Sequence, residues 1–499
     1  AANTLDTVPS ALSSKFSTID ELKNHTNAIY ALRIGGSNNT TSVTLSGTTV
    51  SGQVINYNNT ATITGLPADM TVITALVSRA DELEKALVNN AYIVLVDDIK
   101  ADVVIPEDTT VTLDLNGYTL TNESDHTIIN NGTLTVVDSS EEKTGVVDNI
   151  THAKAALYNE VGATATLNGG EFTRSEENGS SSTESGGNSY YAILNHGTMT
   201  INAGTKITQD GHYSSLIDNG WFYPEQNTTK TPSKLIITGG VFDGGLNTIK
   251  NDDWGVLDIS GGTFSNVTQD VIMNYNTVTI SGGVFDASES NYFVIENINL
   301  NTESSCGKIT ITGGKFIGAI CATEGSTFEI SGNPDFSEVT QIYVYSSEQA
   351  EMFADYSDGV TVIAYTRTAE DFKAFIADSN IDYLFVISNF ELAEVVEITR
   401  DVTININSGV TITIPSSLDE SCVVLRVNSG TLTLIGSGTI DATAAGDKVV
   451  PVAAMGTKGA NEEIIATGNV IISNITIKVD TAYESCVYAM YGGIVTING

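Results

Sequence analysis

The chain has 499 residues, enough for about three ordinary domains, and its formal net charge at pH 7 is −38. This charge excludes proteins that bind the phosphate backbone of nucleic acid, because the two would repel each other. Charged residues make up only 16% of the chain and apolar residues 41%, which excludes a disordered acidic tail. No stretch is long and apolar enough to span a membrane, and the cysteines lack metal-ligand spacing. We therefore expect neither nucleic acid nor a membrane as a partner, and we assign no metal and no cofactor.

The first 77 residues predict a small α+β head. Ser17-Thr18 followed by Asp20 and Glu21 is typical of a helix start. Apolar residues then mark one helical face, namely Ile19, Leu22, Ala28, Ile29 and Leu32. We assign residues 1–34 to an N-terminal helical docking segment. Residues 35–77 alternate apolar and polar residues and predict a small β domain.

A capped amphipathic helix is predicted near residues 78–87, with Leu83, Ala86 and Leu87 on one side. Strand signals follow it, and two short phrases then return along the chain. The first phrase is an aliphatic residue, any residue and Asn, and it ends at Asn130, Asn159, Asn195, Asn219, Asn251, Asn274 and Asn297. The second is Gly-Gly, any residue and Phe, and it ends at Phe172, Phe242, Phe264, Phe285 and Phe316. A repeat that cannot bury its own apolar face stacks on its neighbours, so residues 78–345 predict a β-solenoid module with a capping helix.

Each repeated residue has a structural interpretation. Successive coils of a β-solenoid pair in parallel and in register, about 4.8 Å apart, so equivalent positions stack into ladders. Asn suits a turn, where its side chain binds the backbone and the Asn above and below. The Gly-Gly pair permits a corner with positive φ, and the Phe returns to the core. We therefore expect the asparagines to form a structural ladder.

The same order of elements returns after a linker or cap at residues 346–365. Thr368 begins a second capped helix, with Phe372, Phe375 and Ile376 at the spacing seen in the first helix. Strand signals follow again, and we predict a second solenoid module over residues 366–499. Its last residues, Ile494 to Gly499, match a position early in the first module. We therefore expect more solenoid to follow Gly499 in the natural protein.

The run from Val111 to Leu120, followed by Asn130 to Thr135 and the Gly-Gly-x-Phe phrases, resembles a known family. It is similar to the right-handed parallel β-helix proteins of the pectate-lyase-like superfamily. Within them it looks like the non-catalytic members on bacterial surfaces and on bacteriophage fibres and spikes. The resemblance covers about residues 79–345 and 366–499, and it implies an all-β fold of two tandem right-handed parallel β-helix modules. Residues 1–78 lie outside it.

The resemblance implies what an active site would need here. Lyases and hydrolases with this fold use acidic Ca²⁺ ligands with an Arg or Lys base, or Asp clustered with His and Arg. Only Arg174 falls among the repeats of the first module, and it begins a Ser/Gly-rich loop. A polyuronate substrate would also meet a strongly negative surface. We therefore assign no catalytic residue.

The remaining candidate site lies just after the Asn ladder. Counting from each Asn places further side chains on consecutive coils at one corner, namely His196, Trp221, Asp252, Asp253, Trp254 and Tyr275. Exposed aromatic rings beside carboxylates suit glycan binding, because the rings take sugar faces and the acids take hydroxyls. Asp218 with Asp252 or Asp253 would suit inverting glycoside hydrolysis if a water fits between them. The alternative interpretation packs both tryptophans beneath the insertion Phe222–Lys234 and leaves the acids as solvated turn residues.

These features favour a structural, adhesive fibre protein of a bacteriophage virion, such as a head fibre, decoration protein or tail spike. Residues 1–78 would dock it on a capsid or tail protein, and by analogy with phage fibres we expect a homotrimer that binds host or mucosal glycans at the virion surface. The start of the chain lacks the basic and apolar regions of a signal peptide, so either a signal peptide has been removed or the gene product lost its initiator Met. The second alternative agrees with cytoplasmic assembly. A bacterial cell-surface adhesin is one alternative. A carbohydrate-active enzyme, either a hydrolase or a lyase, is the other.

Overall fold

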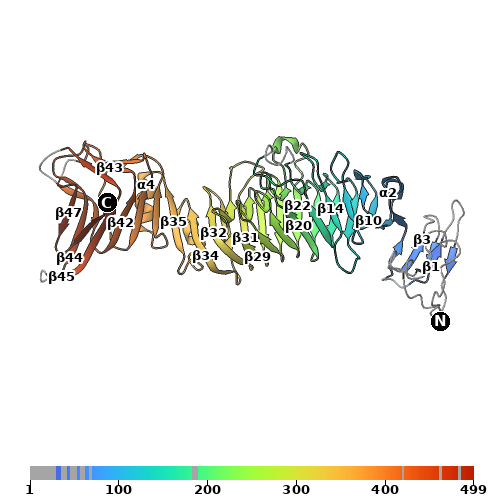
Figure 1. The fold of residues 1–499 in the computed structure, drawn as a ribbon. Coiled ribbons are helices and arrows are strands. Elements are labelled where there is room, and N and C mark those ends of the chain that lie inside the picture. The colour runs from blue at the N-terminus through green and yellow to red at the C-terminus, as the bar shows by residue number, and fades with distance from the viewer. Residues whose placement is uncertain are drawn as a thin grey trace. The chain divides into compact units, whose positions relative to one another are not determined.

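The computed structural model describes residues 30–34, 42–44, 53–56, 62–66, 70–181, 189–418, 421–459, 463–480 and 485–498. The chain divides into two compact units, Ala1–Thr268 and Gln269–Gly499. The expected boundary between solenoid modules, at residues 346–365, therefore lies inside the second unit. Figure 1 shows strands stacked side by side within each unit. The helix start at Ser17 and most of the helical face predicted after it lie outside the described residues.

The described strands of the head pair in parallel. One sheet has the order β1 (Tyr30–Ile34), β3 (Gln53–Asn56), β5 (Val72–Ile73), and β2 (Ser42–Thr44) pairs with β4 (Thr62–Thr64). Leu32, which was predicted to lie on a helical face, lies in β1 opposite Val54, so that part of the prediction is wrong. The physical reason is visible in the strand itself, because its apolar residues Tyr30, Leu32 and Ile34 recur at every second position.

Helix α2 (Ala80–Ala86) precedes the coils of the first unit and buries Leu83. Its start is held by Glu82, whose carboxylate accepts hydrogen bonds from the backbone nitrogen and the hydroxyl of Ser78, at 3.0 and 3.1 Å. The helix lies between β6 (Ala75–Val77) and β7 (Ala91–Leu95), which pair in parallel.

In the first unit almost every strand pairs in parallel with the strand three positions further along the chain, so each coil contributes one strand to each of three faces. The first face continues from β7 through β10 (Thr110–Asp114), β13 (Thr133–Val137), β16 (Thr164–Leu167), β19 (Thr198–Ile201), β22 (Ser233–Ile237) and β25 (Gly255–Ile259). The second has β8 (Ile99–Lys100), β11 (Thr119–Thr121), β14 (Val146–Asp148), β17 (Gly170–Thr173), β20 (Thr205–Gln209), β23 (Val241–Gly244) and β26 (Thr263–Ser265). The third has β9 (Val103–Ile105), β12 (Ile128–Asn130), β15 (Leu157–Asn159), β18 (Ile193–Asn195), β21 (Ile217–Asn219) and β24 (Ile249–Asn251). This arrangement matches a parallel β-helix, as the sequence predicted.

The second unit begins with the same kind of coil. Its strands are β27 (Ile272–Asn274), β28 (Thr277–Ile280), β29 (Val284–Asp286), β30 (Phe293–Asn297), β31 (Lys308–Ile311), β32 (Lys315–Ala322), β33 (Thr327–Ile330) and β34 (Asp335–Val344). Strands β32 and β34 are long enough to extend over two faces. Strand β32 shows this, since it pairs with both β29 and β30. The parallel pairing then continues from β34 to β35 (Thr361–Thr366) and β36 (Tyr383–Val386).

Residues 346–365, expected to be a linker or cap, hold helix α3 (Ser347–Met352) and most of β35. Strand β35 pairs on both sides, so this segment continues the sheet and is not a linker. Val362, Ala364 and Thr366 recur at every second position and are buried, which is typical of a strand, and Ile363 on the other face is buried as well. The next helix, α4 (Ala369–Ala377), has a capping box between Thr368 and Asp371 and buries Phe372, Phe375 and Ile376, which confirms the predicted helix start and its apolar face.

The later coils of the second unit again pair each strand with the third one after it. From β36 the sheet continues to β39 (Val402–Ile406), β42 (Gly430–Gly436), β45 (Ile464–Ser473) and β48 (Ile494–Asn498). A second face has β37 (Phe390–Glu391), β40 (Thr411–Thr413), β43 (Thr439–Ala442) and β46 (Thr476–Val479). The third face has β38 (Val396–Ile398), β41 (Cys422–Val427), β44 (Val449–Lys458) and β47 (Val487–Met490).

The repeated phenylalanines stack inside the core of the first unit and of the first coils of the second unit. In the first unit Phe242 and Phe264 stack with their ring centroids 4.6 Å apart and their planes 6° apart. In the second, Phe285 and Phe316 stack at 5.1 Å and 6°. All four side chains are fully buried. Gly240 has a φ of 114°, and a Cβ there would lie 2.9 Å from the carbonyl oxygen of Thr205, so this corner requires glycine.

Candidate functional site

The asparagines at the ends of the third-face strands form a continuous hydrogen-bonded ladder in the first unit. The amide nitrogen of each donates to the amide oxygen of the next at 2.7 to 2.8 Å, from Asn130 through Asn159, Asn195 and Asn219 to Asn251. Each of the first four also donates to a backbone carbonyl, as Asn195 does to Lys234 at 3.1 Å. In the second unit Asn274 donates to Asn297 at 2.8 Å. All seven side chains are fully buried, so their polar atoms serve the turn and face no ligand.

An aromatic column follows the ladder in the first unit. The Trp221 ring stacks on the His196 ring, with centroids 3.8 Å apart and planes 7° apart. His196 Nδ1 shares a hydrogen bond with the Tyr158 hydroxyl at 3.1 Å, and the Tyr158 ring packs against His126 at 5.2 Å. Burial lowers the pKa of both histidines to about 4, so they are neutral at physiological pH. The column therefore joins consecutive coils by uncharged rings.

Two of the residues predicted for an exposed glycan platform are closed off in this column. Trp221 is only 9% exposed and His196 is also buried, so the expected exposed stack does not form at these positions. Trp254 is partly exposed and has a left-handed backbone, with a φ of 61°, while its carbonyl oxygen accepts the Ser233 amide at 3.0 Å. Tyr275 belongs to the second unit, where its carbonyl oxygen accepts the Ser305 hydroxyl at 2.7 Å.

A buried charge cluster lies beside the column. Asp218 in β21 is directly opposite Lys250 in β24, and Lys250 Nζ lies 2.5 Å from Asp252 Oδ2. Burial and then the negative charge of Asp252 raise the pKa of Asp218 well above its ordinary value, while Lys250 lowers it. Asp218 is 1% exposed, and its Oδ1 has no hydrogen-bond partner among the described residues.

These acids are therefore not the solvated turn residues of the alternative interpretation. Asp252 and Asp253 are buried like Asp218, at 3% and 6% exposure, and the Asp253 carbonyl oxygen accepts the Trp221 amide at 2.9 Å. An inverting hydrolase needs a carboxylate pair with room for a water on an accessible sugar. The burial of Asp218 and Asp252 and the cation between them fit a packed ion cluster better than such a pair.

The insertion between β21 and β22 covers this cluster. The Lys250 ammonium lies 4.4 Å from the centroid of the Phe222 ring. Phe222 and Tyr223 pack edge to face, with centroids 4.7 Å apart, and they are 55% and 53% exposed. The exposed aromatic pair of this corner is thus in the insertion, which sequence reasoning treated only as a cover.

Arg174 also has a structural role. It is fully buried, its Nη1 donates to Glu177 Oε2 at 2.6 Å, and its other nitrogens donate to the carbonyls of Thr151 and Lys154. Glu177 Oε2 also accepts the Tyr190 amide at 2.8 Å. Burial raises the pKa of Glu177 to about 7 despite the opposing charge of Arg174. This pair ties the loop after β17 to the preceding coils.

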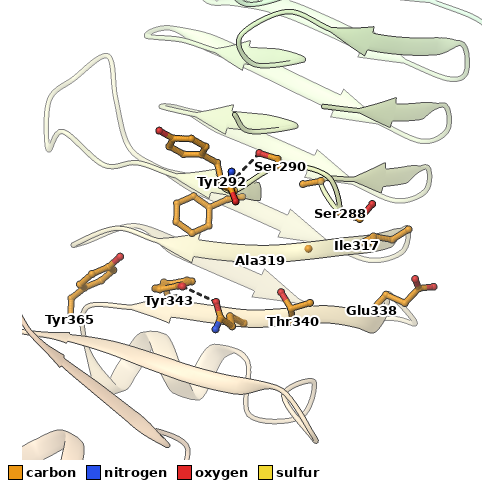
Figure 2. Close-up of a pocket in the computed structure, with 14 residues that line it drawn as sticks. Ser288, Ser290, Tyr292, Ile317, Ala319, Glu338, Thr340, Tyr343 and Tyr365 are labelled. Atoms are coloured by element: carbon orange, nitrogen blue, oxygen red, sulfur yellow. Dashed lines mark hydrogen bonds between the residues drawn. The ribbon is translucent and has the colours of Figure 1, made fainter. Parts of the chain in front are cut away.

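A groove on the second unit was not predicted. It has a volume of about 730 Å³ and is lined by residues of β30, β32 and β34, by Tyr365 of β35 and by the turn before β30. Figure 2 shows Tyr292, Tyr343 and Tyr365 at one end, Ser288, Ile317 and Glu338 at the other, and Ala319 between them. A second hollow of about 480 Å³ shares Gln341, Tyr343 and Tyr365 with it and extends to β36.

The sequence did not indicate this groove. Its aromatic residues come from strands far apart in the chain and outside the two repeated phrases. Register places Ala319 directly opposite Phe293, and this small side chain leaves the hollow open. No pattern along the chain indicates such a juxtaposition, because it depends on which strands pair.

A carboxyl pair lies near this groove. Asp270 Oδ1 accepts the Phe293 amide at 2.9 Å, and Asp270 is hydrogen-bonded to Glu296 of β30. Burial and the Glu296 charge raise the pKa of Asp270 to about 8, and burial raises the pKa of Glu296. The pair therefore shares a proton at neutral pH.

Among the described residues no group of His, Cys, Asp and Glu side chains is arranged to hold a metal ion. None of the helices in the described parts of the chain is long and apolar enough to cross a membrane. Comparison of the chain with family models, with curated proteins and with solved structures finds no significant match.

Proposed function

We propose that this chain is a structural, adhesive fibre protein of a bacteriophage virion, built on a right-handed parallel β-helix of the pectate-lyase-like type. The observation that supports this proposal most is that the repeated residues hold each coil to the next. The buried Asn ladder and the stacked Phe core leave these positions no chemistry toward a substrate. Such stacking adds length with each coil and makes a stiff support, which a display fibre needs.

The proposal includes two tandem modules with capping helices. In each case a short helix, α2 or α4, precedes strands that pair with the third strand after them. A helix at this place protects the apolar end of a solenoid and its unpaired strand edge. Residues 1–78 dock on a capsid or tail protein in this proposal, and the fibre is a homotrimer.

An antibody raised against this chain tests the placement. Immunogold electron microscopy of intact virions and of cells from the source culture is expected to label the virions. Label confined to cell surfaces would overturn the virion placement and support the bacterial adhesin. Light scattering of the purified chain is expected to give the mass of three copies, and a strict monomer would contradict the trimer.

The carbohydrate-active enzyme stays the weaker candidate, because the Asp218–Lys250–Asp252 cluster is buried and ion-paired. Incubation with neutral and acidic polysaccharides, followed by assays for reducing ends and unsaturated products, is expected to show no release. Release that Asp218→Asn abolishes would establish the enzyme instead.

A further inference from the structure

We propose that the groove over β30 to β36 of the second unit binds a neutral oligosaccharide. This inference rests on the adhesive role proposed above and names the ligand class. Its first support is the row of aromatic rings along the groove. Tyr343 and Tyr365, on neighbouring strands, lie with ring centroids 5.7 Å apart and planes 27° apart. Phe293 meets Tyr343 at 5.4 Å and Phe385 meets Tyr365 at 5.9 Å, both edge to face.

Polar groups suited to sugar hydroxyls accompany these rings. The Tyr343 hydroxyl donates to Gln341 Oε1 at 2.7 Å, which orients the amide and leaves its nitrogen free of partners among the described residues. The hydroxyls of Ser288 and Thr340 line the same groove. A pyranose has an apolar C–H face and a rim of hydroxyls, so aromatic faces next to hydroxyl and amide groups complement it.

Charge selects the class of glycan. The lining of the two connected hollows contains one charged side chain, Glu338, which is paired with Lys315 at 2.5 Å. With no cation among the residues that line the two hollows and a formal net charge of −38 on the chain, a polyanionic glycan would be repelled. A neutral oligosaccharide meets neither that repulsion nor the cost of removing its charges from water.

Length and backbone geometry favour an oligosaccharide over a peptide. The two hollows share Gln341, Tyr343 and Tyr365, so together they form a track across several strands that suits a chain of sugars. Strands β32, β34 and β35 are paired on both sides and offer no free edge to a peptide strand.

The experiment uses the full chain, an array of neutral, acidic and amino-sugar glycans, and calorimetry with the neutral oligosaccharide that binds best. Ala319→Tyr fills the hollow from an outward position and is expected to abolish binding. Tyr292→Ala removes a 48% exposed ring and is expected to weaken binding about tenfold, in line with about 1.4 kcal/mol for one aromatic contact. Tyr488→Ala, at a 40% exposed tyrosine in β47, is the matched control and is expected to leave binding unchanged.

Circular dichroism of each variant separates loss of fold from loss of binding, and Tyr292→Ala decides the question if Ala319→Tyr does not fold. The proposal is overturned if no neutral glycan binds, if acidic glycans bind as well as neutral ones, or if the folded groove variants bind like the wild type. None of these results bears on the immunogold test of the fibre, so the two proposals fail separately.

Discussion

At the scale of single residues, the interior of this protein holds charges that most solenoid positions lack. Arg174 with Glu177 in the first unit and Asp270 with Glu296 in the second are the sharpest cases. Arg174 donates to backbone carbonyls of the preceding coil, and Asp270 accepts the Phe293 amide of the following coil. Their energetics are therefore tied to the stacking of coils, and substitutions at these residues test it.

Arg174→Met is expected to lower the free energy of unfolding by about 3–5 kcal/mol, because it leaves the Glu177 carboxylate buried without its cation. The matched control is Arg79→Met, whose ion pair with Asp81 is more than half exposed and is screened by solvent, so this variant is expected to unfold like the wild type. Urea unfolding of the three proteins measures the difference. Equal losses at the two arginines would contradict the buried pair as a determinant of stability.

The raised pKa of Asp270 predicts that the stability of the fold depends on pH. Its pKa in the folded protein is about 8, above the ordinary value of 3.8, so the folded state keeps a proton that the unfolded chain loses. This contribution to stability is fully present below the ordinary pKa and disappears as the pH rises through about 8. Asp270→Asn is expected to make the loss of stability between about pH 5 and pH 8 shallower, as followed by urea unfolding. An unchanged slope would show that Asp270 titrates normally.

At the scale of elements, the Asn ladder at the turns and the stacked Phe rings in the core both join successive coils. Asn195→Ala is expected to cost about 1–3 kcal/mol, since the buried amide of Asn159 loses its acceptor. Asn202 makes a similar Asn–Asn bond to Asn168 at 2.8 Å in an exposed position, so Asn202→Ala is the control with a smaller expected loss. Thermal unfolding followed by circular dichroism compares them, and an equal effect would mean that burial does not strengthen the ladder.

At the scale of the whole molecule, the excess of acidic residues dominates. Repulsion among them opposes the compact state, and salt reduces the screening length from about 30 Å at 0.01 M to about 8 Å at 0.15 M. The thermal midpoint is therefore expected to rise with sodium chloride over that range. A falling midpoint in calorimetry would instead indicate that the surface ion pairs, such as Lys308 with Glu329, outweigh the repulsion.

The sequence by itself determined the coil. The Asn and Gly-Gly-x-Phe phrases specify the turn, the corner and the core residue of each repeat. Repeats of this kind bury their apolar faces by stacking on one another. It also predicted that the residues after each Asn would meet at one corner, and His196 and Trp221 do stack there.

Only the tertiary structure decided what is exposed. Burial of Trp221 and Asp218 depends on which loops fold over the corner, and the groove depends on Ala319 pairing opposite Phe293. The continuation of the sheet through β35 likewise depends on pairing on both sides. These features depend on contacts between segments that are distant along the chain. The repeated phrases lie within single coils, so their periodicity could predict the coil but not the surface that the stacked coils expose.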